Sequence, residues 1–161
     1  MEEKVKRILT NNLFMTLATV SATGNPWSTP VFYALDEQYN FYWYSRKDTR
    51  HSQNIQENNN VSASIFSPEG EDKLEGVYVA GIATELVEEE LQHATELYAK
   101  KAAVNEEELE QLTAVEDFLG DAPVRMYKLT PMKMYISGEA TKWEGKWIDS
   151  RIEVSLSELA S

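Results

Sequence analysis

A cluster of cationic and hydroxyl side chains follows the aromatic segment 41–45. The cluster comprises Ser45, Arg46, Lys47, Thr49, Arg50 and His51. The segment has the pattern of a strand that turns into a short polar helix, and the free amides at a helix start attract anions. In a chain of net charge −12, this concentration of positive charge predicts a site for one phosphate group.

The same cluster has a plainer interpretation. A solvated helix start would carry these charges only to balance acidic residues elsewhere in the chain. Asp48 is expected to cap a helix from about Thr49 to Glu57, which the run 58–60 ends. A carboxylate in that position would compete with a phosphate for the same amide groups. From these residues alone, both interpretations stay open.

Other kinds of catalytic site find little support in the composition. The chain has no cysteine, which excludes disulfides, thiolate catalysis and iron–sulfur ligation. Two histidines, His51 and His93, give a histidine-based metal site little basis, so no metal is predicted. The glutamate runs 88–90 and 106–108 are typical of solvated helix faces. No phosphate-cradling glycine-rich loop or Ser-His-Asp order is present.

Most of the negative charge belongs to one region, because residues 85–121 hold twelve acidic side chains and two lysines. No basic stripe exists, so no nucleic-acid partner is expected. The first residues show neither a signal peptide nor an apolar anchor, so no membrane partner is expected and the expected location is cytoplasmic. We expect one domain over residues 1–161, with an acidic helical insertion at about 88–120.

Turn residues and hydrophobic patterns divide the rest of the chain into short elements. A helix at 2–11 should bury Val5, Ile8 and Leu9. Further helices are expected at 88–102 and 105–119, the second opened by Asn105 and closed by Gly120. Strands are expected at 13–20, 27–35, 41–45, 61–67, 75–87, 124–130 and 132–138, with a loop at 68–73 and a final hairpin or strand at 141–148.

These elements indicate a mainly β, α+β fold with a small antiparallel barrel and its helices packed outside. Pro30 lies inside an expected strand, where it cannot donate to a ladder. It therefore marks an edge, a bulge, or a place where something other than a strand lies alongside. Gly81 is expected at a bend or a close approach of two backbones, and Pro131 is expected to separate two strands.

The order of several short motifs resembles the pyridoxamine 5′-phosphate oxidase-like flavin-binding split β-barrels over about residues 1–138. The motifs are LATV, STPVF, YS, TRH, GIATEL and YKLTPMKMYISG. The resemblance implies a six-stranded antiparallel split β-barrel of Greek-key type with peripheral helices. It also implies a homodimer, with FMN in the cleft between the two barrels.

The resemblance further implies which residues bind FMN. The phosphate-binding positions fall on Tyr44, Ser45, Thr49, Arg50 and His51. The isoalloxazine ring would lie along Thr29, Pro30 and Val31, partly through backbone groups. His51 stands where the family usually has lysine, so a permanent charge becomes one that titrates near pH ~6–7.

The chain departs from the authentic oxidase in two further places. It has Thr29 and Ala34 where that enzyme has basic residues on the flavin strand, and its tail RIEVSLSELAS lacks the arginine-rich carboxyl end. Oxidation of pyridoxamine phosphate is therefore not expected. The predicted function is an FMN-dependent oxidoreductase acting on an unidentified small-molecule substrate or a reduced nicotinamide, with its catalytic residues unassigned.

Three alternatives stay open: a non-catalytic flavin carrier, a barrel that has lost its cofactor, and a haem-binding relative that uses His51. The substrate would stack on the flavin in a cleft lined by Phe32, Tyr44 and a tryptophan of the partner. Trp143 and Trp147 are expected to pack in the core or at an interface, or to reach the partner's flavin cleft. Tyr78 is a weaker candidate for the same cleft.

Overall fold

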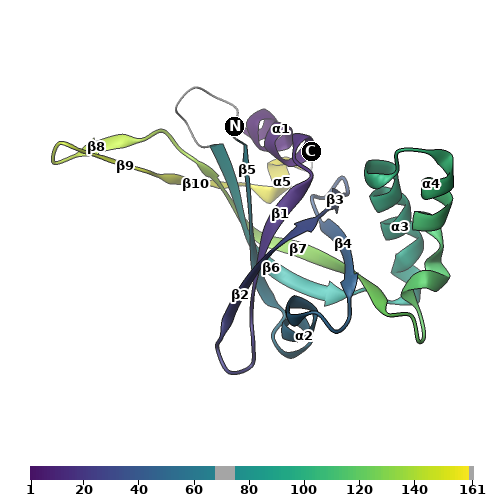
Figure 1. The fold of residues 1–161 in the computed structure, drawn as a ribbon. Coiled ribbons are helices and arrows are strands. Elements are labelled where there is room, and N and C mark those ends of the chain that lie inside the picture. The colour runs from purple at the N-terminus through teal and green to yellow at the C-terminus, as the bar shows by residue number, and fades with distance from the viewer. Residues whose placement is uncertain (68–74, 160–161) are drawn as a thin grey trace.

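The computed structural model describes residues 1–67 and 75–159, and an eight-stranded sheet curls through most of it (Figure 1). The strands of this sheet are β1 (Phe14–Val20), β2 (Pro26–Phe32), β3 (Ala34–Leu35), β4 (Phe41–Arg46), β5 (Asn60–Ser67), β6 (Glu75–Glu85), β7 (Val124–Ser137) and β10 (Arg151–Val154). Their order is β2-β1-β5-β6-β7-β4-β3, with β10 also paired to β7. All pairs are antiparallel. The loop expected at 68–73 lies outside the described residues.

The sheet closes on itself because β2 and β3 are two parts of one segment, which had been expected as a single strand. β2 pairs with β1 and β3 pairs with β4, so this segment occupies both ends of the strand order. Since β10 only extends the sheet beside β7, six strand positions surround the core, which confirms the expected split barrel. β3 pairs with β4 at only two positions, Ala34 to Tyr42 and Leu35 to Phe41. The rest of β2 diverges from β4, and we call this opening the split.

Helices lie at both ends of the barrel (Figure 1). α1 (Glu2–Asn11) packs on β5 and β6 with Val5, Ile8 and Leu9 buried, which confirms the predicted apolar face. The short α5 (Leu156–Leu159) packs beside α1, and α2 (Arg50–Glu57) lies at the other end against β1, β2 and β6. Of the helices in the described ranges, none has the length and apolarity needed to cross a bilayer.

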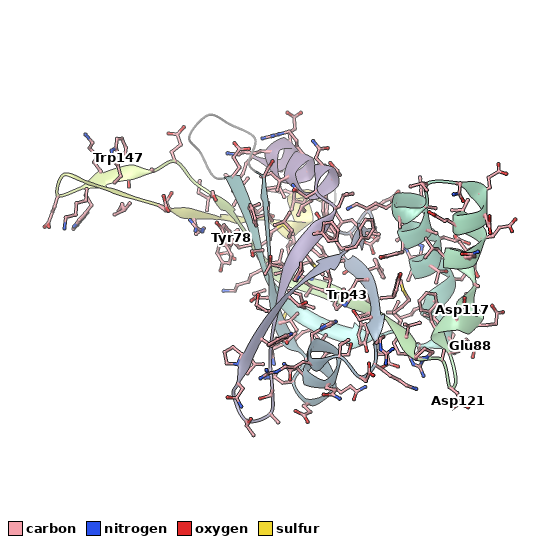
Figure 2. The ribbon with its side chains drawn as sticks, in the orientation of Figure 1. Trp43, Tyr78, Glu88, Asp117, Asp121 and Trp147 are labelled. Atoms are coloured by element: carbon pink, nitrogen blue, oxygen red, sulfur yellow. The ribbon has the colours of Figure 1, made fainter. Side chains whose placement is uncertain are left out.

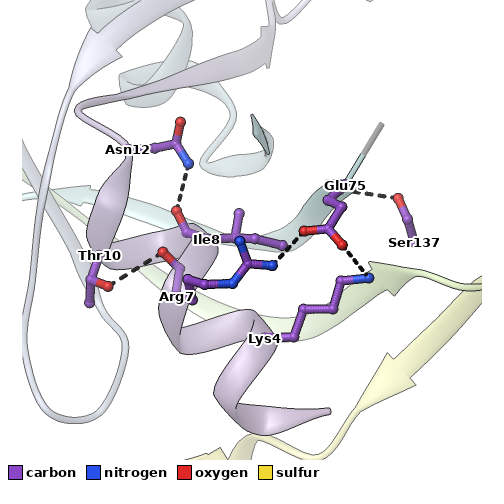
Figure 3. Close-up of polar contacts among 8 residues, drawn as sticks. Lys4, Arg7, Ile8, Thr10, Asn12, Glu75 and Ser137 are labelled. Atoms are coloured by element: carbon purple, nitrogen blue, oxygen red, sulfur yellow. Dashed lines mark hydrogen bonds and ion pairs between the residues drawn. The ribbon is translucent and has the colours of Figure 1, made fainter. Parts of the chain in front are cut away.

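An ion-pair network ties α1 to the start of β6 (Figure 3). The Glu75 carboxylate lies 2.9 Å from Lys4 Nζ and 2.6 Å from Arg7 Nη2. Hydrogen bonds from Lys4 and then Arg7 lower the pKa of Glu75 below its ordinary value. The adjacent Gly76 amide donates to Ser137 Oγ on β7, so the network reaches across two strands.

The acidic region between β6 and β7 forms α3 (Glu88–Ala102), α4 (Glu106–Thr113) and the 3-10 turn η1 (Val115–Phe118). Asn105 caps α4 as predicted, because its side chain accepts a hydrogen bond from the Glu108 amide. The single helix expected at 105–119 is wrong. α4 ends at Thr113, and the chain tightens into η1 so that Phe118 is buried.

α3 is held on the barrel by a lysine whose ammonium group is half-buried. Lys101 Nζ donates to the Asn12 carbonyl at 2.8 Å and lies 3.9 Å from the centroid of the Tyr33 ring. Burial lowers the pKa of Lys101 to about 8. At the other end of α3, Lys128 of β7 lies 2.6 Å from the Glu90 carboxylate. The acidic helices are therefore fastened to the barrel by basic side chains.

β7 runs unbroken through Pro131, so the two strands expected at 124–130 and 132–138 are one. The β6 partner explains why the proline is tolerated, since the register shifts between Ala80 and Gly81, opposite Pro131. A Cβ atom on Gly81 would overlap the carbonyl oxygen of Thr130. A glycine inside a strand predicts a bend or a close approach of two backbones, and Gly81 lies at such a close approach.

A hairpin of β8 (Thr141–Trp143) and β9 (Lys146–Ile148) projects from the barrel, as Figure 1 shows. Glu144 and Gly145 form its turn with positive φ angles of 48° and 79°, which is typical of a tight two-residue hairpin turn. The predicted final hairpin is confirmed. The tail beyond it, for which no element was predicted, returns to the sheet as β10.

Candidate functional site

The predicted binding residues of α2 and of the end of β4 meet at the split. Hydrogen bonding and packing fix α2 there, since Asn54 Nδ2 donates to Thr19 Oγ1 of β1 at 3.0 Å in a buried position. Ile55 of α2 belongs to the barrel core. The first turn of α2 is thereby held between the end of β4 and the start of β2. This is the strand-to-helix corner that the sequence predicted.

An imidazole and three hydroxyls form a continuous polar chain in this corner. His51 Nε2 lies 2.8 Å from Ser45 Oγ and 3.2 Å from Thr49 Oγ1. Thr49 Oγ1 lies 2.9 Å from Ser52 Oγ and donates to the Arg46 carbonyl at 2.9 Å. Ser52 was not predicted here, although its position three residues after Thr49 places the two on one helix face.

His51 is buried, and burial lowers the pKa of its imidazole below the ordinary value. The pKa of His51 is therefore lower than the expected titration near pH ~6–7 implies. At neutral pH the ring is neutral and acts as a hydrogen-bonding partner of Ser45 and Thr49. The positive charge of the corner must come from its arginine and lysine side chains.

Asp48 does not cap α2, which corrects the expected helix start. The carboxylate of Asp48 accepts two hydrogen bonds from Arg46, at 2.9 Å from Nε and 2.6 Å from Nη2. Thr49 is the N-cap residue, and no side chain caps the helix amides. The carboxylate that would have competed with a phosphate is thus turned away from them.

Arg50 lies at the solvent-exposed edge of the corner and stacks on a tryptophan of β2. Its guanidinium carbon lies 4.7 Å from the centroid of the Trp27 ring, and this indole is 41% exposed. Within residues 1–67 and 75–159, Arg50 forms no ion pair. A stacked guanidinium keeps its in-plane N–H groups available to an anion. Trp27 was not predicted as a site residue, because residues 27 and 50 meet only through the fold.

The three predicted residues of β2 divide by strand alternation. Val31 is buried in the barrel core, so only its backbone could contact a ligand in the split. Thr29 is half-buried, and Pro30 is exposed opposite Thr16 of β1. Beside the split, β2 is an edge strand. Of the explanations expected for Pro30, the edge position is the one observed, because no strand on that side needs an N–H donor from it.

The predicted aromatic lining serves mainly to seat α3. The Tyr44 ring lies 5.0 Å from that of Tyr98 and 5.8 Å from that of Phe118, measured between centroids. Phe32 lies 5.2 Å from Tyr98 in the same way. Tyr44 and Ser45 are neighbours on a strand and face opposite sides, so the structure does not bring the Tyr44 ring to the polar corner.

The other aromatic candidates lie away from the split, as Figure 2 shows for Tyr78 and Trp147. Tyr78 lies near the base of the hairpin, where the Arg151 guanidinium carbon lies 4.3 Å from the centroid of its ring. Trp143 and Trp147 lie on the projecting hairpin. Packing of either tryptophan in the core of this chain is therefore wrong.

The donor groups at the corner fit a phosphate. Uncapped helix amides, an arginine without an ion-pair partner in the described ranges and two hydroxyls are the groups that bind phosphate oxygens in proteins. A metal ion finds no comparable site among those residues, since they include no group of three His, Cys, Asp or Glu side chains suited to one. The corner is thus suited to an anion held by hydrogen bonds.

A family model described as pyridoxamine 5′-phosphate oxidase matches residues 1–137. No curated protein matches the sequence. Among solved structures, a haem-binding protein from Mycobacterium smegmatis shares 18% identity at a TM-score of 0.69, covering 99% of this chain and 59% of that one. The chain thus spans less than two thirds of that protein.

Two further structures show the same fold. The haem-storage protein HutZ from Vibrio cholerae shares 18% identity at a TM-score of 0.65, covering 84% of this chain and 93% of that one. PhzG from Burkholderia lata, in complex with tetrahydrophenazine-1-carboxylic acid, shares 16% identity at a TM-score of 0.59, with coverages of 93% and 90%. At these identities the likeness concerns the fold alone.

Proposed function

The chain belongs to the pyridoxamine 5′-phosphate oxidase family, and from that premise we propose that it is an FMN-binding oxidoreductase that works as a homodimer. The observation that carries this proposal is the start of α2, whose amides no side chain caps, beside an arginine stacked on Trp27. Ser45 and Thr49 add hydroxyls at the same corner. Together they would hold the terminal phosphate of FMN.

The protein's own part in such a reaction is to bind and orient the cofactor. FMN, when bound, supplies the electron-transfer chemistry through its ring. The phosphate-binding groups of the corner would hold one end of the molecule, while the backbone of β2 at Thr29, Pro30 and Val31 would run along the ring. The neutral His51 would keep Ser45 and Thr49 in place through its hydrogen bonds.

The incomplete site supports the proposed homodimer. β2 is an edge beside the split, and one barrel offers a wall on only one side of a ring lying there. A second barrel across this edge would supply the other wall and exclude water from the ring. The family resemblance supports the same arrangement, with one cofactor for each corner.

The substrate we propose is a small planar molecule or a reduced nicotinamide that stacks on the free face of the ring. The PhzG structure, a relative by fold, is a complex with tetrahydrophenazine-1-carboxylic acid, which supports a small substrate built on a ring system. Pyridoxamine phosphate is not proposed, because Thr29 and Ala34 replace basic residues of the authentic oxidase.

Titration of FMN into the Arg50→Ala variant tests the phosphate assignment. Loss of a charge-assisted hydrogen bond costs about 1.5–3 kcal/mol, so the dissociation constant should rise roughly 10- to 100-fold. The matched control is R46A/D48A, because these two side chains pair with each other and their joint removal leaves no free carboxylate beside the helix amides, so it should be nearly silent. Equal FMN affinity in the Arg50→Ala and unaltered proteins would remove the assignment.

Haem binding is the second candidate, since two of the structural relatives are described as a haem-binding and a haem-storage protein. The corner favours FMN over haem, because His51 Nε2 already contacts Ser45 and Thr49. Absorption spectra taken after removal of unbound ligand separate the candidates: a flavin spectrum that stays with the protein supports the first, and a Soret band that stays with it supports the second. Anaerobic reduction by NADH or NADPH, followed by reoxidation with electron acceptors, separates an oxidoreductase from a flavin carrier.

A further inference from the structure

The hairpin of residues 141–148, here called the arm, exposes two large aromatic side chains. Trp143 is 66% exposed and Trp147 is 69% exposed, and Ile148 beside them is 45% exposed. Tryptophan is the residue type that most often anchors a protein interface. An exposed pair on a projecting hairpin therefore indicates a surface that is covered by a partner.

Each face of the arm carries one indole and one ammonium group. Lys142 pairs with Trp147 across the hairpin, and Trp143 pairs with Lys146. Directly opposite residues of an antiparallel pair share a face. The Lys142 ammonium lies 5.0 Å from the centroid of the Trp147 ring. The matching surface should therefore be apolar at its centre and negatively charged at its rim.

A groove with this character lies between α3 and α4. It has a volume of about 680 Å³, and its apolar lining includes Ala103, Val104 and Leu109. Val104 is 83% exposed, which is unusual for a branched apolar side chain. Three carboxylates, those of Glu96, Glu106 and Glu110, and one ammonium group, that of Lys100, line the groove, which is therefore negative on balance.

We propose that the arm of one copy docks in the α3–α4 groove of a second copy. The indole of one face would fill the apolar floor, and the lysine beside it would meet the acidic rim. Figure 1 places the arm and the α3–α4 pair on opposite sides of the barrel, so the chain's own groove is out of reach of its arm. A two-fold axis would let each copy give one arm and receive one, which closes the assembly as a dimer.

The chemical match distinguishes this partner from others. The chain carries a net charge of −12, concentrated in residues 85–121, so the acidic groove repels the same region of a second copy. The arm tip combines positive charge with exposed indoles, because its two lysines flank one glutamate, Glu144, beside Trp143 and Trp147. Charge complementarity of this kind selects orientation and suppresses wrong pairings. The contact needs no flavin, and within the same two-fold dimer it adds to the interface proposed across β2.

Charge reversal on both sides tests the contact by sedimentation of the protein without FMN. The variants K142E/K146E and E106K/E110K should each raise the dimer dissociation constant about tenfold or more, with unchanged circular dichroism spectra. Since E106K/E110K lowers the net negative charge, general repulsion would predict the opposite change. Combining all four substitutions should recover most of the lost affinity.

The matched control is E88K/E89K, which makes the same charge change at the start of α3, outside the groove. This control should leave dimerisation unchanged. Wild-type dimerisation of E106K/E110K, failure of the combined variant to recover affinity, or equal weakening by the control would each overturn the proposal.

The variant W143A/W147A tests whether the two indoles dock in the groove or in the flavin cleft. Docking in the groove predicts weaker dimerisation, with FMN affinity unchanged at protein concentrations where the dimer persists. Weaker FMN binding at unchanged dimer affinity would place the indoles at the cleft and overturn the groove contact. Failure of FMN to bind any variant would count against the flavin proposal alone, because sedimentation is measured without it.

Discussion

At the scale of single residues, the candidate site is satisfied internally. The imidazole of His51 and the hydroxyls of Ser45 and Thr49 bond to one another, so no buried polar group of the three lacks a partner. A phosphate must therefore compete for hydroxyl hydrogens that are already in use. Arg50 is different, since its guanidinium rests on an indole face and is open to solvent. It should thus dominate the affinity.

The buried imidazole makes stability depend on pH. Because the pKa of His51 is lowered in the folded protein, the unfolded chain binds its proton at a higher pH than the folded chain does. The stabilisation of the fold by the neutral His51 is complete above the pKa of histidine in the unfolded chain, which is about 6.5. It is lost as pH falls below that pKa, and the free energy of unfolding drops by at most ~1.4 kcal/mol per pH unit. Urea unfolding between about pH 7.5 and 5.5 should show this slope.

His51→Gln should flatten the slope, because an amide keeps a hydrogen bond and does not titrate in that range. The control is Gln53→Ala on the exposed face of α2, which changes no titrating group and should leave the slope as it is. A slope that persists unchanged in His51→Gln would mean that another group controls the pH dependence.

At the scale of elements, the position of the site depends on where strands part. The β2–β3 segment pairs with β4 only through the two residues of β3. α2 occupies the end of the barrel where β2 and β4 diverge. The opposite wall of the barrel is continuous, because β7 extends through Pro131. The long β6–β7 pair thus supports β4, which pairs with β7, whereas β2 is attached to the sheet through β1.

Gly81→Ala should destabilise the protein strongly, because Gly81 lies where the backbones of β6 and β7 approach closely. A Cβ there would overlap the Thr130 carbonyl oxygen, which belongs to a paired strand and cannot move alone. Overpacking of this kind costs roughly 1–3 kcal/mol, and the rigid neighbour places it at the upper end. Urea unfolding monitored by tryptophan fluorescence gives the change in unfolding free energy.

Gly76→Ala on the same strand is the comparison. Its Cβ would meet the end of the Tyr78 side chain at 2.8 Å, and a side chain can rotate away. The loss should therefore be clearly smaller than for Gly81→Ala. An equal or smaller loss at Gly81 would show that β7 yields easily at Pro131.

At the scale of the whole molecule, the proposed dimer and the flavin should stabilise each other. If FMN needs walls from two barrels, it binds the dimer better than the monomer, and linkage requires saturating FMN to tighten dimerisation. Sedimentation across a dilution series should give a dimer dissociation constant at least tenfold lower with FMN than without it. A monomer that keeps full FMN affinity on dilution would contradict the shared site.

The sequence by itself determined the local features of this protein. The apolar spacing of Val5, Ile8 and Leu9, the cap at Asn105 and the hairpin turn at 144–145 depend on neighbouring residues, so periodicity and turn chemistry suffice to predict them. The order of motifs was also enough to indicate the family, which the match over residues 1–137 confirms.

The tertiary structure alone decided which side chains meet. It buried His51, placed Trp27 under Arg50 and moved Tyr44 to the α3 side. These outcomes depend on strand register and on how far the barrel opens. Both are set by the packing of residues distant in sequence, and local patterns carry no information about such distances.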